Sequence, residues 1–306
     1  MTATDGIRIA VVGYASLDST VRSPRFEGLD ATSIVGPKLA DGNAGGIVHI
    51  TSAVHLAGAE ADAVSWVGCD ENGARWRAAL RAHGASDTGV AASGSRTPTS
   101  TLIHFEAGGT ICLFDPGDCH GNDLTAEQTT LIRNADWCLL TVAPRHVVEQ
   151  VLDTLPDTAR LAWAVKSDAS AFPPGLVERI LGRAELVSFS SGEIPFLSRD
   201  GVRPETRVRP GTLVVETRGA RGVDYAVAGD AAMAGSVEVV PVPAADATGA
   251  GDTFIGTLTA RLAGDEPTVR LTPQRLHHHL VAASDASAAM LERRHRTPLS
   301  ISKETP

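Results

Sequence analysis

The sequence predicts an α/β protein built around a mostly parallel sheet with helices on both faces. Helix-like and strand-like patterns alternate over the middle of the chain: helices are expected at 126–133, 145–155 and 174–182, and strands at 137–141, 161–165 and 186–189. Strands that alternate with helices of this length are typical of βα units, which pair their strands in parallel. Apolar runs at 7–13 and 63–68 predict two further buried strands. The 306-residue chain is 43 % hydrophobic, which is enough for a full α/β core.

Composition narrows the classes of function. The net charge of −9 argues against a broad contact with nucleic-acid backbones. The four cysteines form no Cys-x-x-Cys pair, so neither a zinc ribbon nor a redox motif is indicated, and free thiols in a reducing cytosol are expected. The first residues contain no apolar signal segment, and no run of about 18 apolar residues occurs anywhere. We therefore expect a cytoplasmic protein with no nucleic-acid or membrane partner.

Three further elements are expected before the alternating region. A helix should run from Asn43 to about Ala57, and Asp70 should cap a helix at 74–83. Two strand-like segments, 99–106 and 110–114, flank a turn with consecutive glycines, which predicts a hairpin.

One stretch late in the chain combines a glycine turn with a carboxylate: Asp246-Ala247-Thr248-Gly249-Ala250-Gly251-Asp252-Thr253-Phe254. Apolar residues recur at helical spacing from Phe254 onward, so a helix should start at or near Gly249. The preceding segment, Val237–Val242, is expected to be a strand. Glycines at such a junction let the backbone approach a ligand, and the free N–H groups of the first helical turn form an anion site.

Asp252 falls in that first turn, where the helix dipole stabilises an ionised carboxylate. An ionised Asp can accept a proton from a hydroxyl while neighbouring N–H groups hold a transferring phosphoryl group. The alternative is that Asp252 only complements the helix dipole, because acidic residues are enriched in first turns.

The full string from Asp246 to Phe254 closely resembles the C-terminal signature of the ribokinase-like (PfkB) sugar and nucleoside kinases. The resemblance implies a single kinase domain over residues 1–306, with the fold of a three-layer α/β sandwich with a mostly parallel central sheet and a small β-sheet lid. The lid segments would be inserted at about 19–43 and 97–120. By the same resemblance Asp252 is the catalytic base, and the backbone anion hole consists of Gly249, Ala250 and Gly251. In the family the lid often makes a dimer contact, which leaves open a homodimer through the lid.

On the acceptor side, the resemblance assigns hydroxyl binding to Asp18, and a carboxylate that accepts two hydrogen bonds suits a vicinal diol. A loop Asp that caps a turn is the alternative. Gly45 and Gly46 match a glycine pair whose backbone approaches the acceptor closely. Four residues past that pair the family usually has Asn, where this chain has Ile50 with His49 beside it. His49 is a candidate substitute as donor or acceptor, although a His on a helix is more often packed or solvated.

On the nucleotide side, the segment Ser190-Ser191-Gly192-Glu193 occupies the place of the family's Asn-x-x-Glu motif, which organises Mg²⁺, water and phosphate. Ser190 replaces the Asn. Glu193 is expected to act on Mg²⁺ through water, because a carboxylate suits an ion that keeps most of its waters. Thr248 is expected to contribute to nucleotide binding, together with a loop that matches the family at Thr217, Gly219 and Gly222.

Three cations are candidate phosphate ligands. Arg218 and Arg221 lie in the nucleotide loop, and guanidinium groups bind phosphate well. Lys166 follows an expected strand at its C-terminal end, where ligands bind in such sheets, and it either binds a phosphate or is solvated.

The sequence thus predicts an ATP-dependent kinase that transfers the γ-phosphoryl group to a hydroxyl of a sugar or sugar-like small molecule, with Mg²⁺ and ATP bound. A nucleoside kinase of the same family is one alternative. A non-catalytic sensor that binds a sugar or nucleotide is another, motivated by Ile50 and Ser190. The chain contains no Gly-x-x-x-x-Gly-Lys-[Ser/Thr] string, which excludes a P-loop kinase.

Overall fold

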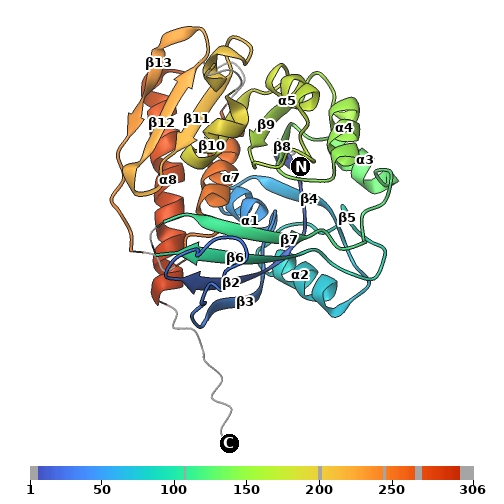
Figure 1. The fold of residues 1–306 in the computed structure, drawn as a ribbon. Helices are drawn as coiled ribbons and strands as arrows, with labels where there is room; N and C mark the ends of the chain where they lie inside the picture. Colours follow the sequence, from blue (N-terminus) through green and yellow to red (C-terminus); the bar gives the residue numbers. More distant parts are fainter. Residues whose placement is uncertain (1–5, 107, 199–201, 244–245, 266–270, 297–306) are drawn as a thin grey trace, which may run out of the picture.

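The computed structural model describes residues 6–106, 108–198, 202–243, 246–265 and 271–296. Within these residues the main sheet has nine strands in the order β13-β12-β11-β10-β9-β8-β1-β4-β5 (Figure 1). The strands from β11 to β5 run parallel, and β12 and β13 are added antiparallel at one edge. Their bounds are β1 Arg8–Val12, β4 Glu60–Val67, β5 Val90–Ala92, β8 Trp137–Leu140, β9 Arg160–Ala164, β10 Leu186–Ser190, β11 Leu213–Thr217, β12 Val223–Val227 and β13 Asp230–Val237.

Helices cover both faces of this sheet, which confirms the predicted α/β class. One face carries α1 (Val48–Leu56), α2 (Glu71–Ala82), α7 (Ala250–Ala263) and α8 (Pro273–Arg296). The other carries α3 (Ala126–Arg133), α4 (Arg145–Thr154), α5 (Pro174–Leu181) and the short α6 (Ile194–Leu197). Successive strand residues point to opposite faces, so each strand supplies two cores. In β1, Ile9 and Val11 pack in the first core, and Ala10 and Val12 in the second.

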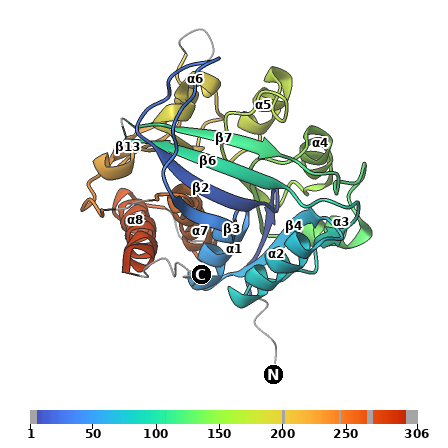
Figure 2. The same cartoon turned by 60° about the horizontal axis from the view of Figure 1, so that its bottom comes forward.

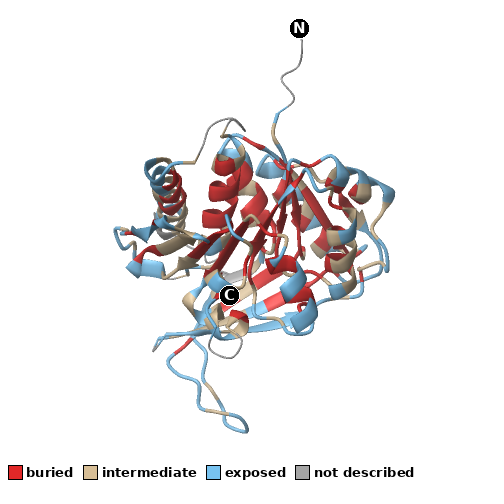
Figure 3. Ribbon diagram, turned by 90° about the horizontal axis from the view of Figure 1, so that it is seen from above, coloured by how far each residue is buried: buried red, intermediate tan, exposed pale blue. Residues whose placement is uncertain are grey.

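Many of the buried residues lie on the strands of the main sheet and on α7. Figure 3 shows buried residues along the strands of the main sheet and on the inward sides of the helices. Helix α7 is buried along most of its length, between α1 and α8. A helix that is apolar on nearly all sides belongs in the interior of a domain. Burial begins at Thr253, so the packed part of α7 supports a first turn, Ala250–Asp252, that is itself partly exposed.

A second sheet of four strands, in the order β3-β2-β6-β7, forms a separate layer that we call the lid (Figure 2). Its strands are β2 Leu17–Ser23, β3 Lys38–Ala44, β6 Thr99–Phe105 and β7 Thr110–Asp115. Strand β2 starts shortly after β1 ends, so the lid begins at the carboxyl edge of the main sheet. The hairpin predicted around consecutive glycines is confirmed as β6 and β7, and Gly108 and Gly109 adopt positive φ angles of 96° and 91°.

Two local predictions are wrong. Val237–Val242 is not a strand: β13 ends at Val237, and Val240 is 85 % exposed. Val237 pairs with Val223, the first residue of β12, so the segment beyond Val237 has no strand to pair with among the described residues, and the apolar alternation there is misleading.

The helix expected from Asn43 begins only at Val48. Asn43 and Ala44 instead pair with Asp18 and Leu17 in the lid, and Gly46 has a φ of 60°, which a helix does not allow. By contrast, Asp70 caps α2 as expected, because its Oδ1 accepts the Gly73 N–H at 2.8 Å. No helix in the described part of the chain combines the length and the apolar character required to cross a bilayer.

Candidate active site

The turn that precedes α7 matches the predicted anion site in its backbone geometry. Gly249 is the N-cap of α7 with a φ of 80°, a conformation that favours glycine. Helix α7 begins at Ala250, as expected from the sequence, and Asp252 is the acidic residue of its first turn. The Asp246 Oδ1 atom accepts the Thr248 N–H at 2.8 Å, which fixes the entry to the turn.

Lys166 lies directly opposite Asp252. Its Nζ is 3.3 Å from Asp252 Oδ1, and the side chains are 44 % and 17 % exposed, respectively. The Asp252 carboxylate is the main cause that raises the pKa of Lys166, and Glu193 raises it further, while burial opposes the shift. Lys166 follows β9, so two residues far apart in sequence form a charged pair beside the turn. Lys166 was expected either to bind a phosphate or to be solvated, and its pairing with Asp252 shows that it is not simply solvated.

The lid presents a row of side chains toward this pair. Asn43, Asp18, Ser100 and Phe114 are in register across β3, β2, β6 and β7. Residues in register share one face of a sheet. Asp18 is only 9 % exposed, and its Oδ1 accepts hydrogen bonds from Ser16 Oγ at 2.8 Å and from Ser100 Oγ. The predicted acceptor-binding carboxylate is thus held in one orientation by two hydroxyl groups.

The glycine pair packs beneath this row. A Cβ atom at Gly45 would overlap Asp18 Oδ2, and a Cβ at Gly46 would overlap the Tyr14 carbonyl oxygen. The Gly45 N–H donates to the Ser16 carbonyl at 2.8 Å, so the pair ties α1 to the start of the lid. Glycine is required here because the backbone runs against Asp18 itself.

His49 lies between the acceptor side and the turn. A Cβ at Gly249 would be 2.7 Å from His49 Cδ2, so the imidazole packs against the turn. Burial lowers the pKa of His49. The Asp252 and Asp18 carboxylates oppose that shift, and the Arg294 guanidinium supports it. The structure therefore brings His49 near both predicted carboxylates, as a neutral ring.

Ser190 and Glu193 meet at the end of β10. The Ser190 N–H donates to Glu193 Oε2 at 2.7 Å and the Ser190 Oγ at 3.0 Å, which forms a capping box. Next to them Ser191 Oγ donates to Glu216 Oε1 at 2.7 Å. Hard carboxylate oxygens at the ends of two adjacent strands are the donor type that Mg²⁺ accepts. The residues present fit this ion.

The predicted nucleotide loop follows β11, whose last residue Thr217 is in register with Ser190. Gly219 and Gly222 have φ angles of 57° and 88°. No atom of the described residues lies within 4 Å of a Cβ built on Gly219, so this part of the loop is open. Arg218 pairs with Asp224 at 2.6 Å, so that guanidinium is held by its own hairpin rather than turned to a phosphate.

Sequence reasoning missed three residues of this region. Cys112 of β7 shares the inward face of the lid, where desolvation and Asp18 raise the pKa of its thiol and Lys166 opposes the shift. Phe114 ends the lid row and contacts Tyr14, with ring centroids 4.8 Å apart. Arg294 of α8 reaches Thr248. Strand alternation could have identified Cys112 and Phe114, but no local pattern marks Arg294.

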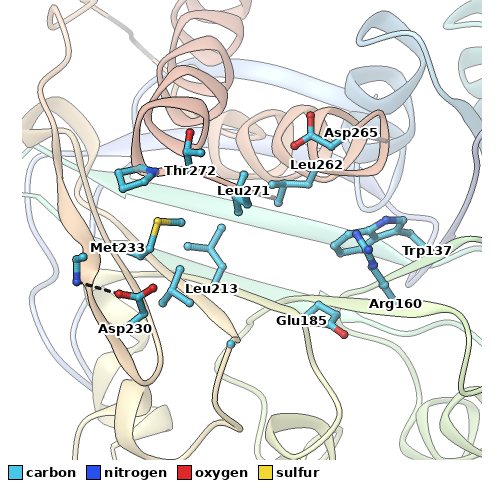
Figure 4. Close-up of a pocket in the computed structure, with 14 residues that line it drawn as sticks. Trp137, Arg160, Glu185, Leu213, Asp230, Met233, Leu262, Asp265, Leu271 and Thr272 are labelled. Atoms are coloured by element: carbon cyan, nitrogen blue, oxygen red, sulfur yellow. Dashed lines mark hydrogen bonds between the residues drawn. The ribbon is translucent and has the colours of Figure 1, made fainter. Parts of the chain in front are cut away.

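A pocket of about 590 Å³ lies at the other edge of the main sheet (Figure 4). It is bounded by residues at the starts of strands and by the segment between α7 and α8, including Trp137, Glu185, Leu262 and Leu271. Among the described residues that line it, none belongs to the predicted site. Asp252 and Arg294 lie at one end of α7 and α8, and the pocket is lined by the other end of each helix.

Comparisons with known proteins show the family and the fold of this chain. A family model described as the pfkB family of carbohydrate kinases matches residues 7–300. No curated protein matches the sequence significantly. Many solved structures share the fold, and three illustrate the range.

The Cryptococcus neoformans ribokinase in complex with ADP has a TM-score of 0.72 and 17 % identity, over 94 % of this chain and 99 % of that one. The Arabidopsis thaliana ribokinase with ribose and ATP has a TM-score of 0.68 and 18 % identity, over 94 % and 93 %. The Burkholderia thailandensis nucleoside kinase with inosine has a TM-score of 0.71 and 16 % identity, over 95 % and 92 %. Because the family model matches nearly the whole chain, the chain belongs to the pfkB family of carbohydrate kinases. These are ATP-dependent enzymes that phosphorylate a hydroxyl group.

Proposed function

We propose that this protein transfers the γ-phosphoryl group of ATP to a hydroxyl of a sugar or sugar-like acceptor, with Asp252 as the base. The observation that carries the proposal is the position of Asp252, in the first turn of a buried helix and 3.3 Å from Lys166. A carboxylate there can accept the hydroxyl proton while the N–H groups of Gly249, Ala250 and Gly251 hold the transferring group.

The acceptor would lie between the lid and the turn. Asp18 Oδ1 is already engaged by Ser16 and Ser100, so Oδ2 is the atom left to accept acceptor hydroxyls. Because the two serines prevent rotation of the carboxylate, the bound acceptor would keep one hydroxyl directed at Asp252. Holding both groups in a reactive geometry is a large part of catalysis in phosphoryl transfer.

Lys166 has a role that the charges support. Because Asp252 raises its pKa, the ammonium group stays charged at neutral pH. It lies where it can attract the phosphate oxygens of ATP and stabilise the Asp252 carboxylate before proton transfer. In this proposal Lys166 is a binding cation and Asp252 is the proton acceptor.

Mg²⁺ would be held near Glu193 through water, with Glu216 beside it. When bound, the ion neutralises phosphate charge. The capping contacts from Ser190 orient Glu193 without neutralising it. In this proposal ATP would lie along the nucleotide loop, which is open at Gly219. Thr217, Gly222 and Thr248 are the other proposed nucleotide-binding residues.

A nucleoside acceptor is the second candidate, and one observation favours it. Phe114 stands in the same lid row as Asp18, is 39 % exposed, and packs edge-on against Tyr14. An exposed aromatic ring in the same row as a carboxylate that would bind a diol suits an acceptor that carries a ribose and a flat base. The structural neighbour bound to inosine is a nucleoside kinase, which is consistent with this candidate.

A homodimer through the lid is also proposed. Several large apolar side chains are exposed on the lid and on its loop between β2 and β3: Phe26, Leu29, Ile34, Val35 and Leu113. Clustered exposed apolar residues mark contact surfaces more often than isolated ones do. Sedimentation of wild type and of Leu29→Glu would test this arrangement.

The test of the function is direct. Purified protein is incubated with ATP, Mg²⁺ and a panel of sugars and nucleosides, and ADP release is followed. Strong release with one acceptor would establish the kinase and its substrate class together. ATP binding without release on any acceptor would instead support the non-catalytic sensor.

A further inference from the structure

Arg294, in the last turns of α8, reaches back to the turn that precedes α7. Its Nη1 donates to the carbonyl oxygen of Thr248 and lies 4.0 Å from Asp246 Oδ2. The N–H group of Thr248 donates to Asp246 Oδ1 at 2.8 Å. Both backbone polar groups of Thr248 are therefore held, the N–H by Asp246 and the carbonyl by Arg294. Thr248 directly precedes Gly249, so these contacts set the position of the anion-binding turn.

The same guanidinium contacts His49. Arg294 Nη2 lies 3.4 Å from His49 Nε2. A guanidinium is always protonated and has no acceptor atom, so it can only donate. Nε2 of His49 must then present its lone pair, and the proton of the neutral ring resides on Nδ1. The lowered pKa of His49, caused mainly by burial and supported by Arg294, keeps the ring in this neutral form.

Arg294, His49 and the turn are one contiguous unit. His49 packs against Gly249, where a Cβ would be only 2.7 Å from its Cδ2. About two turns earlier on α8, Ser287 Oγ donates to the Ala250 carbonyl at 2.9 Å. The C-terminal part of α8 thus holds the turn at two points, and the Arg294 side chain is two-thirds buried in doing so.

We infer that Arg294 is a positioning residue for phosphoryl transfer, which clamps the anion-binding turn through Thr248 and holds His49 as its Nδ1–H tautomer. This inference rests on the proposed kinase function. The turn can stabilise developing charge only if its N–H groups are preorganised, and the fixed positive charge behind it adds to their field. Nδ1 of His49 has no hydrogen-bond partner among the described residues, so its proton is left to donate to the acceptor.

The kinetic test compares Arg294→Met, Arg294→Lys and a control, Arg275→Met. Arg275 lies at the other end of the same helix and also pairs with an aspartate, Asp265, at 2.7 Å. For Arg294→Met we expect kcat to fall on the order of 10²-fold, the effect of a small misplacement of catalytic groups, with the KM for ATP nearly unchanged. Arg294→Lys should recover part of kcat, because an ammonium keeps the charge and one donor. Arg275→Met should keep the wild-type kcat.

The second readout does not depend on turnover. In long-range ¹H–¹⁵N spectra of the intact protein, wild-type His49 should show a protonated Nδ1 and an unprotonated Nε2; the His49→Gln variant assigns the signal. In Arg294→Met this preference for the Nδ1–H tautomer should be lost. The pKa of His49 should rise, because the positive charge that helps to lower it is gone. Arg275→Met should leave both unchanged.

Each result has one meaning. A wild-type His49 protonated at Nε2, or equal kcat values for Arg294→Met and Arg275→Met, would overturn the inference. If no acceptor is phosphorylated by wild type, the kinase proposal fails. The tautomer of His49 then still decides whether Arg294 holds that ring.

Discussion

The proposed anion-binding turn is one continuous stretch, from Asp246 to Asp252, whereas the proposed acceptor-facing row of the lid takes one residue from each of four strands. The turn opens a helix that is buried along most of its length. The row sits on a sheet whose last strand, β7, is largely exposed. In the proposed reaction, one region would be preformed and the other assembled from several strands.

This difference has a physical consequence. A turn fixed by a buried helix keeps its N–H groups in place with or without ligand, which is what electrostatic stabilisation needs. A row held by hydroxyl contacts on a partly exposed sheet can adjust to the acceptor. We therefore expect substitutions in the turn to lower kcat and substitutions in the lid to raise the KM for the acceptor.

Among the substitutions that compare the two regions, the largest effect should follow Gly249→Ala. A side chain at a φ of 80° is strained, and its Cβ would lie 2.7 Å from His49 Cδ2, so the turn must shift. We expect kcat to fall about 10²–10³-fold, as for loss of an oxyanion donor. The matched control is Gly264→Ala at the far end of α7, where φ is −72° and the nearest atom is 3.5 Å away. Equal kcat values for the two variants would show that the turn is not preformed.

Next in size is Gly45→Ala in the acceptor region. Its Cβ would overlap Asp18 Oδ2, so the carboxylate must leave its two serine partners. Losing a hydrogen bond to a charged group corresponds to roughly 10–100-fold in kcat/KM for the acceptor. Most of the loss should be in KM. Gly36→Ala, also in the lid region but 3.7 Å from the nearest atom, is the control; a loss confined to kcat would break the proposed division of roles.

The junction between lid and core should respond to pH through His120. Its ring contacts Tyr14 and Trp66, and its Nε2 is buried without a partner among the described residues. Burial, helped by His146, lowers the pKa of His120 to about 4.

Between pH 6.5 and about 4, His120 therefore binds a proton in the unfolded chain but not in the folded protein. The free energy of unfolding should fall by up to about 3 kcal/mol as the pH drops through this window. His120→Phe keeps a ring there and cannot titrate. The Tm of wild type should therefore fall more steeply from pH 7 to 4 than that of the variant; parallel curves would contradict the expectation.

A smaller effect is expected for Glu193→Gln. Glutamine can still accept the Ser190 hydrogen bonds, so the capping box survives while the charge is lost. The Mg²⁺ concentration for half-maximal rate should rise several-fold, because a neutral amide is a weaker ligand for this ion or its waters. Glu149→Gln, an exposed partner of Arg145 on α4, is the control. An unchanged Mg²⁺ titration would remove Glu193 from the proposed metal site.

The sequence predicts the turn better than the lid, because the turn is one continuous stretch and the lid row is assembled from four strands. Gly249 and Asp252 are defined by a local pattern of glycines and helical spacing, and the helix begins where that pattern places it. The alternating strands and helices likewise define the parallel sheet. The strand expected at Val237–Val242 is wrong because β12, the described partner of β13, begins opposite Val237 and leaves the apolar pattern beyond it without a strand to pair with.

The rest could not be read from local patterns. The row of Asp18, Ser100 and Phe114 depends on strand register, which tertiary packing decides. The pairing of Lys166 with Asp252, and of Arg294 with Thr248, joins residues far apart in the chain. A single sequence shows that such cations are present but not which carboxylate or carbonyl they meet.

The most direct test of the central claim is a single-turnover measurement of phosphoryl transfer by wild type and Asp252→Asn, at saturating ATP and with the acceptor that the panel identifies. The amide keeps the shape of the side chain but accepts no proton. If Asp252 is the base, ATP binding should persist and the transfer rate should fall by about 10²–10⁴-fold. A transfer rate close to that of wild type would contradict the account.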